Sequence, residues 1–309
     1  MNEILKLEKT DAKVLSWKEA FEKGVIEEQG VEASSETRGS VIIFDELSEY
    51  SEFETVIPKR VNFRNLFLFR KGLQEFEIVE KISFSKDGIY DSTWVFEEGV
   101  KGTIVRVFEG SEGLKINHKS IALKGAEVSQ TNLWFNGLNI NAESVNHLKG
   151  GGSQINQNDL VLINGMQDAK IRLNVLHKGE NTSSKSLIKN VVKDSARQTF
   201  DGIIKILKSG QKSNGYLETN SMLLSENASC NNNPSLEIEA DDVKATHAAT
   251  TEHIGKDSLF YLQSRGVSQE LGKELVIKSF LESIISNYSE KLQDFIKEKI
   301  NEKWVKKIK

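Results

Sequence analysis

The feature that most limits the fold of this chain is a long series of short apolar or alternating segments, each closed by a turn signal, between about Val61 and His247. The clearest examples are "NLFLFRKG", "KISFSKDG", "TIVRVFEG", "KSIALKG", "DLVLING", "AKIRLNVLHKG" and "GIIKILKSG". The chain has only two prolines, Pro58 and Pro234, against 22 glycines. Because proline cannot donate to a backbone ladder, its scarcity favours strands that are bonded on both sides. We therefore predict a mainly β chain.

Two architectures fit such a series. Two compact β-sandwiches would produce it, and so would a β-solenoid, whose short strands stack rung on rung. A chain of 309 residues has room for two compact domains or one elongated domain. The series has no sharp numerical period, so the pattern alone leaves the two architectures open.

The segments before the strands predict a mixed region. Asp11 can cap a first helix that ends at Gly24, and its apolar residues at helical spacing are Val14, Trp17 and Phe21. The acidic stretch from Glu27 to Gly39 is typical of a linker. "SVIIFDEL", which starts at Ser40, is either a short strand or a buried turn.

After Gly255 the pattern becomes helical and amphipathic. One expected face comprises Leu271, Leu275, Val276, Phe280, Ile284 and Tyr288, and a second comprises Leu292, Phe295, Ile296, Ile300 and Trp304. These faces can pack on the β body, and part of the surface can instead dock a partner.

Composition excludes several classes of protein. The formal net charge of −4 gives no basic excess for binding nucleic acid. No run reaches the eighteen or so apolar residues of a membrane helix, and the N-terminus does not resemble a secretion signal. A single cysteine, Cys230, fits a reducing compartment, so we expect a cytoplasmic protein.

Signatures of catalysis are lacking. "GGGSQIN" at Gly150 lacks the lysine of a phosphate-binding loop and is interpreted as a loose turn. The sequence contains no G-x-G-x-x-G after a strand, no H-E-x-x-H, no C-x-x-C and no G-x-S-x-G. The five histidines, at positions 118, 147, 177, 247 and 253, do not fall into zinc-ligand spacings. We therefore expect a protein that is not an enzyme.

Three stretches carry a resemblance to a known family. They are "HKGENTSSKSLIKNVVKDSARQTFDGIIKI", "ETNSMLLSENASCNNNPSLEIEADDVKATHAAT" and "LFYLQSRGVSQELGKELVIKSFLESI", within residues 177–285. In motif order and spacing they resemble the SufB and SufD scaffold proteins of iron–sulfur cluster assembly. The region before residue 170 matches only in its general pattern, and the chain is shorter than typical bacterial members.

The resemblance implies a right-handed parallel β-helix core with helical parts at both ends. We expect an N-terminal helical or mixed region over 1–59, the β-helix over 60–254 and a C-terminal helical domain over 255–309. It also implies that the helical domain docks SufC, an ABC-type ATPase, so that ATP enters only through this partner. Two scaffold chains would pair near the end of the β-helix, where a transient [4Fe–4S] or [2Fe–2S] cluster is built.

The same resemblance singles out His247. It occupies the position of the SufD histidine in "DDVK-x-x-H", which lies at the junction with SufB, and we expect it to bind iron of the nascent cluster. Ala248 and Thr219 stand where SufB has an acid and a cysteine, so the chain is SufD-like at both positions. The partner is then a SufB-like chain, or a second copy of this chain if it is a single scaffold, and sulfur donor proteins are further candidate partners. A core histidine satisfied by a neighbouring carbonyl is the alternative.

The remaining candidate residues are weaker. Cys230 lies in "SENASCNNNP", interpreted as a polar turn, and is either an incidental thiol or a sulfur or iron ligand. Glu252 and His253 are either further ligands or solvated loop residues. Phe260, Tyr261 and Arg265 are expected to lock the helical part onto the β-helix or to contact the ATPase.

The leading hypothesis is thus a non-catalytic scaffold subunit of the Suf assembly complex. One alternative is a purely architectural subunit of the same complex, without a cluster ligand. A remote alternative is a β-helix protein that acts on carbohydrates, for which the sequence lacks a secretion signal and clustered carboxylates.

Overall fold

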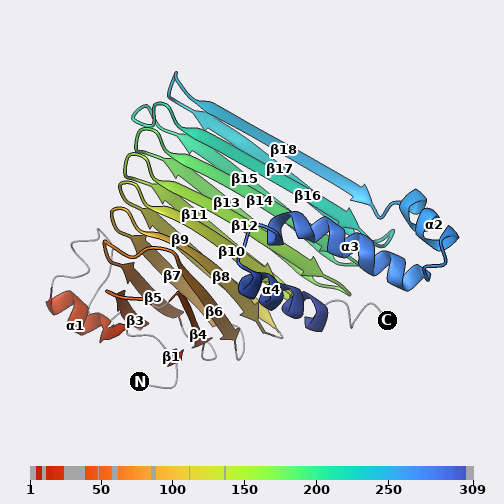
Figure 1. Ribbon diagram of the computed structural model, residues 1–309, viewed down its shortest axis with the longest axis horizontal. Coiled ribbons are helices and arrows are strands. Elements are labelled where there is room, and N and C mark those ends of the chain that lie inside the picture. Colours follow the sequence, from red (N-terminus) through yellow and green to blue (C-terminus); the bar gives the residue numbers. More distant parts are fainter. Residues whose placement is uncertain are drawn as a thin grey trace.

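The fold is a parallel β-solenoid, as the computed structural model shows for residues 5–8, 12–23, 39–47, 49–57, 62–84, 88–110, 112–135 and 137–303 (Figure 1). Its strands form two nine-stranded sheets, which the chain enters alternately, so that each turn of the chain adds one strand to each sheet. Apart from the first strand of each sheet, neighbouring strands are parallel. The predicted mainly β class and the solenoid are therefore confirmed.

The sheets are named here sheet A and sheet B. In spatial order, sheet A contains β1 (Leu5–Glu8), β4 (Tyr50–Ile57), β6 (Phe76–Phe84), β8 (Lys101–Glu109), β10 (Glu127–Trp134), β12 (Gln154–Ile163), β14 (Ser183–Val192), β16 (Asn214–Leu223) and β18 (Lys244–His253). From the same end, sheet B contains β2 (Lys13–Ser16), β3 (Gly39–Phe44), β5 (Asn62–Phe69), β7 (Gly88–Phe96), β9 (Gly113–Ala122), β11 (Asn139–Leu148), β13 (Asp168–His177), β15 (Arg197–Ile206) and β17 (Ser229–Ile238).

Alternation of side chains builds the interior between the sheets. Along β11, for example, the even-numbered residues from Ile140 to Leu148 are buried, while the odd-numbered residues between them face outward. The first rungs are filled by stacked aromatic rings, with the ring centroids of Phe67 and Trp94 4.3 Å apart. Because every strand except the two at the ends of each sheet has neighbours on both sides, the few prolines of the sequence are explained.

The N-terminal prediction was partly wrong. The expected helix around Val14 begins instead as β2, and only Trp17–Glu22 forms helix α1. Pairing with β3 outweighs the helical spacing, since Leu15 is buried and the Trp17 Nε1 group donates to the Arg64 carbonyl at 2.8 Å. Asp11, Gly24 and residues 27–38 lie outside the described residues.

Parallel strands begin earlier than residue 60. The segment "SVIIFDEL" contributes most of strand β3, and β4 follows it in sheet A, so one rung lies within residues 39–57. The three domain boundaries given above stay a prediction.

Three helices follow the solenoid: α2 (Lys256–Ser264), α3 (Gln269–Ile285) and α4 (Glu290–Lys303). Helices α3 and α4 lie across the outer face of sheet A (Figure 1). They bury a second apolar cluster whose strand residues include Val105, Leu160 and Met222. Tyr288, between the helices, hydrogen-bonds Thr131 and Asn158 of the sheet.

The expected apolar face of α3 was partly wrong: Ile284 is buried and Val276, Phe280 and Tyr288 pack against the second apolar cluster, but two of the expected residues are not buried. Leu271 and Leu275 are exposed, whereas the buried residues of this helix are Gly272, Ile277, Leu281, Ile284 and Ile285. Apolar residues surround much of this helix, so spacing alone does not choose its buried side. For α4 the expected Leu292, Ile296 and Ile300 are buried, while Trp304 lies outside the described residues.

Candidate functional site

The two ends of the solenoid differ in their exposed edges. At the first end, the short strands β1 and β2 pair antiparallel with β4 and β3 and cover the sheet edges. At the far end, no strand of the described residues pairs with the outer side of β17 or β18. Uncovered edge strands present backbone groups that can pair with another chain.

The free edge of β18 is continuous over ten residues. The Lys244 amide donates to the Ser213 carbonyl at 3.0 Å, and the Ile254 amide donates to the Leu223 carbonyl at 2.9 Å, so even-numbered residues bond to β16. In parallel strands alternate residues bond to opposite neighbours. The odd-numbered amides, including that of Ala249, therefore point to the free edge.

The free edge of β17 is interrupted. Its odd-numbered residues bond to β15, since the Ser229 and Glu239 amides donate to the Ala196 and Ile206 carbonyls. Pro234 is consequently one of the residues on the free edge, where it supplies no donor. The edge of β18 is thus better suited to pairing than that of β17.

His247 lies on the inner face of β18. It is in register with Leu217 of β16, which is fully buried, yet His247 itself is exposed. The difference arises because β18 is the last strand of sheet A and no further rung covers its inner face. A core histidine, the alternative interpretation, does not fit this exposure.

Cys230 is on strand β17, so its placement in a polar turn was wrong. The Sγ group donates to the Gln198 Oε1 atom of the rung below, at 3.3 Å, and the side chain is half-buried against the inner core. Burial raises the pKa of the thiol to about 11. The group is therefore protonated at neutral pH and is a weak nucleophile and metal ligand until it loses its proton.

Asn232 of β17 forms hydrogen bonds with both β16 and β18. Its Nδ2 group donates to Ser221 at 2.9 Å and to Thr251 at 3.2 Å, and its Oδ1 atom accepts from Thr219 at 3.1 Å. Nothing in the sequence pattern marked this residue, although an inward asparagine two residues after Cys230 is a signal that could have been used.

The contact between Asn232 and Thr251 also fixes which residues face each other across the interior. Since β17 and β18 run in opposite directions, Cys230 lies toward His253 and Leu236 lies toward His247. Cys230 and His247 are therefore not brought together within one chain.

The other expected ligands are divided between two faces. Glu252 is exposed on the outer face of β18, in register with Met222, whereas His253 is exposed on the inner face, in register with Leu223. Thr219, at the position compared with a cysteine, is fully buried and hydrogen-bonded. Across the described residues, no three His, Cys, Asp or Glu side chains cluster as a metal site would require.

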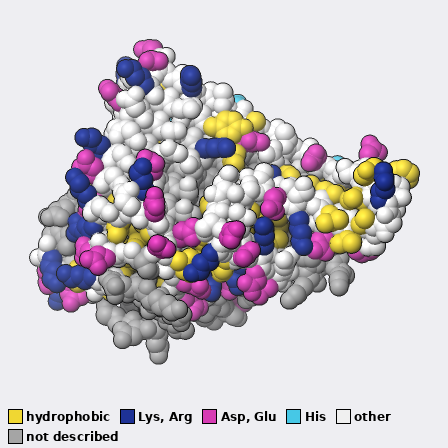
Figure 2. Space-filling model, in the orientation of Figure 1, with side chains coloured by type: hydrophobic (Ala, Val, Ile, Leu, Met, Phe, Trp, Pro, Cys, Tyr) yellow, Lys and Arg dark blue, Asp and Glu magenta, His cyan; other side chains and the backbone are white. Residues whose placement is uncertain are grey.

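Helix α2 stands away from the sheets and carries an apolar surface (Figure 2). Phe260 is 73% exposed and Tyr261 is 58% exposed, and Leu271 and Leu275 of α3 are exposed as well. The expectation that Phe260 and Tyr261 lock this part onto the β-helix was therefore wrong, and the buried Leu259 of α2 packs instead near Gly272 of α3. The Arg265 guanidinium lies over the Tyr261 ring, 5.4 Å from its centroid.

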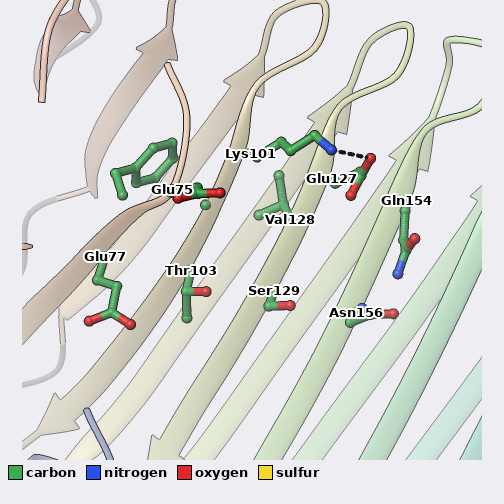
Figure 3. Close-up of a pocket in the computed structure, with 11 residues that line it drawn as sticks. Glu75, Glu77, Lys101, Thr103, Glu127, Val128, Ser129, Gln154 and Asn156 are labelled. Carbon is green, nitrogen blue, oxygen red and sulfur yellow. Dashed lines mark ion pairs between the residues drawn. The ribbon is translucent and has the colours of Figure 1, made fainter. Parts of the chain in front are cut away.

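A separate hollow of about 340 Å³ lies on the outer face of sheet A (Figure 3). Its lining is mostly polar and includes Glu75, Glu77 and Asn156, and the Lys101 ammonium pairs there with Glu127 at 2.8 Å. None of the residues expected from the sequence lines it. No helix within the described part of the chain is long and apolar enough to cross a membrane.

Comparison with known families assigns the chain. Residues 93–280 match the family described as "SUF system FeS cluster assembly, SufBD core domain". This match covers more than half of the chain, including the strands from β8 to β18 and most of α3. The chain belongs to the SufBD family of iron–sulfur cluster assembly proteins.

Individual relatives agree with this assignment. The chain is 34% identical over 145 residues to the iron–sulfur cluster assembly protein SufD of Bacillus subtilis, which covers 47% of this chain and 33% of the relative. It is 31% identical over 146 residues to SufD of Escherichia coli, covering 42% and 34% of the two chains. A SufBD family protein of Synechocystis is 28% identical over 127 residues, covering 41% and 26%. The matches thus span about a third of the length of these relatives or less.

Proposed function

We propose that this chain is a non-catalytic scaffold subunit on which an iron–sulfur cluster is assembled in the cytoplasm. The observation that carries the proposal is the uncovered last rung, where His247 is exposed on the inner face of β18 in register with the buried Leu217. An exposed imidazole at an open strand edge is available both to iron and to a second chain. Membership of the SufBD family supplies the assembly function.

Pairing takes place through the free edge of β18. Its odd-numbered backbone groups, including those of Ala249, would bond to a strand of a second scaffold chain, which is either a SufB-like chain or another copy of this one. The paired edge would bring ligands of the second chain toward His247. Cluster assembly then takes place at the junction between the chains.

The cluster, [4Fe–4S] or [2Fe–2S], is cargo that the scaffold must release. His247 supplies an exchangeable iron ligand, and Glu252 and His253 are weaker candidates on the same strand. Cys230 contributes only if iron or a sulfur donor protein displaces the proton of its thiol, because burial raises its pKa to about 11.

The helical part docks SufC. Phe260 and Tyr261 are exposed apolar side chains of α2, Arg265 stacks over Tyr261, and Leu271 and Leu275 are exposed on the neighbouring helix α3. Contiguous exposed apolar side chains are typical of protein interaction surfaces. ATP binding and hydrolysis belong to this partner.

The proposal is tested by reconstitution. The chain is co-expressed with its SufC and reconstituted with iron and sulfide without oxygen, as wild type, His247→Ala and Cys230→Ser. We expect His247→Ala to lose most cluster absorbance and transfer, and Cys230→Ser to retain most of both. Unchanged cluster yield and transfer in both variants would instead indicate a purely architectural subunit.

A further inference from the structure

The turns that follow the strands of sheet B stack unusually tightly at their glycines. The Lys149 and Gly150 amides both donate to the Ala122 carbonyl, and the Lys178 and Gly179 amides both donate to the Leu148 carbonyl. A Cβ atom on Gly150 would lie 1.9 Å from the Lys124 amide nitrogen, and one on Gly179 would lie 2.6 Å from the Gly150 carbonyl carbon. The turn at Gly150, interpreted from the sequence as loose, is therefore closely packed.

This stacking places basic side chains on adjacent rungs. Lys149 and Lys178 follow Leu148 and His177, which are in register, so the two lysines are separated by about one strand spacing of 4.8 Å. His147 lies on the outer face of the sheet, two residues before Lys149, and is in register with Leu176.

A third lysine approaches from the preceding rung. Lys119 of β9 is in register with Val145, two residues before His147 on the same outer face. The four side chains form what is called here the lysine cluster: Lys119, His147, Lys149 and Lys178.

Three carboxylates on the same or neighbouring rungs pair with other cations, whereas Glu180, two residues after Lys178, is exposed and forms no ion pair with a described residue. Glu143 pairs with Arg172 at 3.6 Å, Asp91 pairs with Arg64 at 3.8 Å, and Glu98 pairs with Lys124 at 3.8 Å. No carboxylate of the described residues forms an ion pair with any of the three lysines of the cluster. In a chain of net charge −4, the lysine cluster is thus a local concentration of positive charge that can attract an anion.

Burial and the neighbouring positive charges lower the pKa of two groups of the lysine cluster. Burial, followed by Lys119, Lys178 and Lys149, lowers the pKa of His147 to about 4. Burial and the other two lysines also lower the pKa of Lys149. The Nδ1 atom of His147 is buried and has no hydrogen-bond partner. A bound anion would therefore stabilise the charged forms of His147 and Lys149.

We propose that the lysine cluster binds a phosphate-type oxyanion, either free or as part of a small soluble phosphate compound. Three ammonium groups on adjacent rungs suit one compact polyvalent anion, which can accept hydrogen bonds from all of them. A single carboxylate of a protein partner would neutralise only one charge. The site lies over β9, β11 and β13, which β15 separates from β17 in sheet B, and it does not rest on the function proposed above.

The test follows the imidazole signals of the full-length chain by NMR at constant ionic strength, with chloride as the reference anion. Titration with inorganic phosphate should raise the pKa of His147 by about one unit, because an anion within ~4–6 Å favours the charged form. The His147 signal is assigned with His147→Asn. No phosphate-dependent change at His147 would overturn the proposal.

Phosphate binding by lysine variants distinguishes a specific site from attraction by the general surface charge. Lys149→Gln combined with Lys178→Gln should weaken phosphate binding by about tenfold or more, since hydrogen bonds between charged groups are lost. Lys149→Arg should retain binding. Lys115→Gln is the matched control, because Lys115 is exposed on the same face of β9 and its removal changes the net charge equally per site.

Equal weakening by Lys115→Gln and Lys149→Gln would show that only diffuse charge attracts the anion, and would contradict the site. A parallel titration with pyrophosphate distinguishes the two sources of the phosphate group. Tighter binding of pyrophosphate by about tenfold assigns the site to a larger phosphate compound, and equal binding assigns it to the free anion.

Discussion

His247 and Leu217 are direct neighbours in register on the inner face of sheet A, yet Leu217 is fully buried and His247 is exposed. One rung of a solenoid covers the rung beneath it, and nothing within the described chain covers the last one. The same strand position is therefore structural in β16 and available for binding in β18.

This relationship predicts that truncating Leu217 lowers the stability of the chain far more than truncating His247 does. Leu217→Ala should lower the free energy of unfolding by about 2–5 kcal/mol, because it leaves a cavity in the packed interior. His247→Ala should change it by less than about 0.5 kcal/mol, as is usual for exposed side chains. Urea unfolding followed by circular dichroism measures both, and a loss of several kcal/mol in His247→Ala would mean that the histidine belongs to the core.

The reactivity of Cys230 should reflect its raised pKa. With a pKa near 11, about one thiol in a thousand is ionised at pH 8, so alkylation by iodoacetamide should be about a hundredfold slower than that of an exposed cysteine. The rate should rise steadily up to about pH 11. A fast reaction at pH 7 would show that the thiol is activated and would restore it as a strong candidate ligand.

The same shift predicts a pH dependence of stability. The thiol has a higher pKa in the folded chain than the ordinary value of 9, so the folded state holds its proton more tightly. Its contribution to stability is fully present below about pH 9 and is lost as the pH rises toward 11. Wild type compared with Cys230→Ser should therefore lose stability between these pH values. Parallel pH profiles of the two proteins would contradict this linkage.

A buried ion pair in the early rungs should behave as a coupled unit. The Arg106 Nε group lies 3.5 Å from the Glu80 Oε2 atom, both side chains are fully buried, and the guanidinium also stacks over Trp94. Glu80→Leu or Arg106→Met alone should destabilise the chain by about 3–5 kcal/mol, because each leaves an uncompensated buried charge.

The double variant Glu80→Leu with Arg106→Met should lose less stability than the sum of the two single losses. Chemical denaturation of all four proteins gives the coupling free energy. Additive losses would show that the two groups do not interact across the interior.

If the exposed apolar residues of α2 bind SufC, their removal should abolish SufC binding without unfolding the chain. Phe260→Ser with Tyr261→Ser should abolish co-purification of SufC while shifting the melting temperature by no more than a few degrees, since both side chains are exposed. Met166→Ser is a suitable control, because Met166 is exposed in a turn of the solenoid, away from α2. Retention of SufC by the double variant would place the docking surface elsewhere.

Much of the fold could be predicted because the strand segments and the scarcity of proline are local signals. The choice of a solenoid over two sandwiches came from the family resemblance, since the sequence shows no strict period. The start of α1 and the buried side of α3 could not be predicted from spacing. Pairing with β3 decided the first, and the position of sheet A decided the second.

Only part of the candidate site could be predicted, because the surroundings of its residues depend on contacts that are distant in sequence. The motif located His247, but only the stacking of rungs shows that it is exposed while Leu217 is buried. The pattern around Cys230 indicated a turn, because its polar neighbours Asn231, Asn232 and Asn233 are also residues of turns. Their roles depend on hydrogen bonds between residues that are distant in sequence, such as the bond from Asn232 to Thr251 across the interior, which joins residues 19 positions apart.

The central claim is that the free edge of β18 pairs with a second scaffold chain. The most direct test is the mass of the SufC-bound complex, measured by light scattering, for wild type and Ala249→Pro. The substitution removes an amide that points to the free edge and leaves the bonds from β18 to β16 in place. We predict paired scaffold chains in wild type and a single scaffold chain per complex in Ala249→Pro, with an unchanged far-ultraviolet spectrum. A folded Ala249→Pro variant that still pairs would contradict the claim.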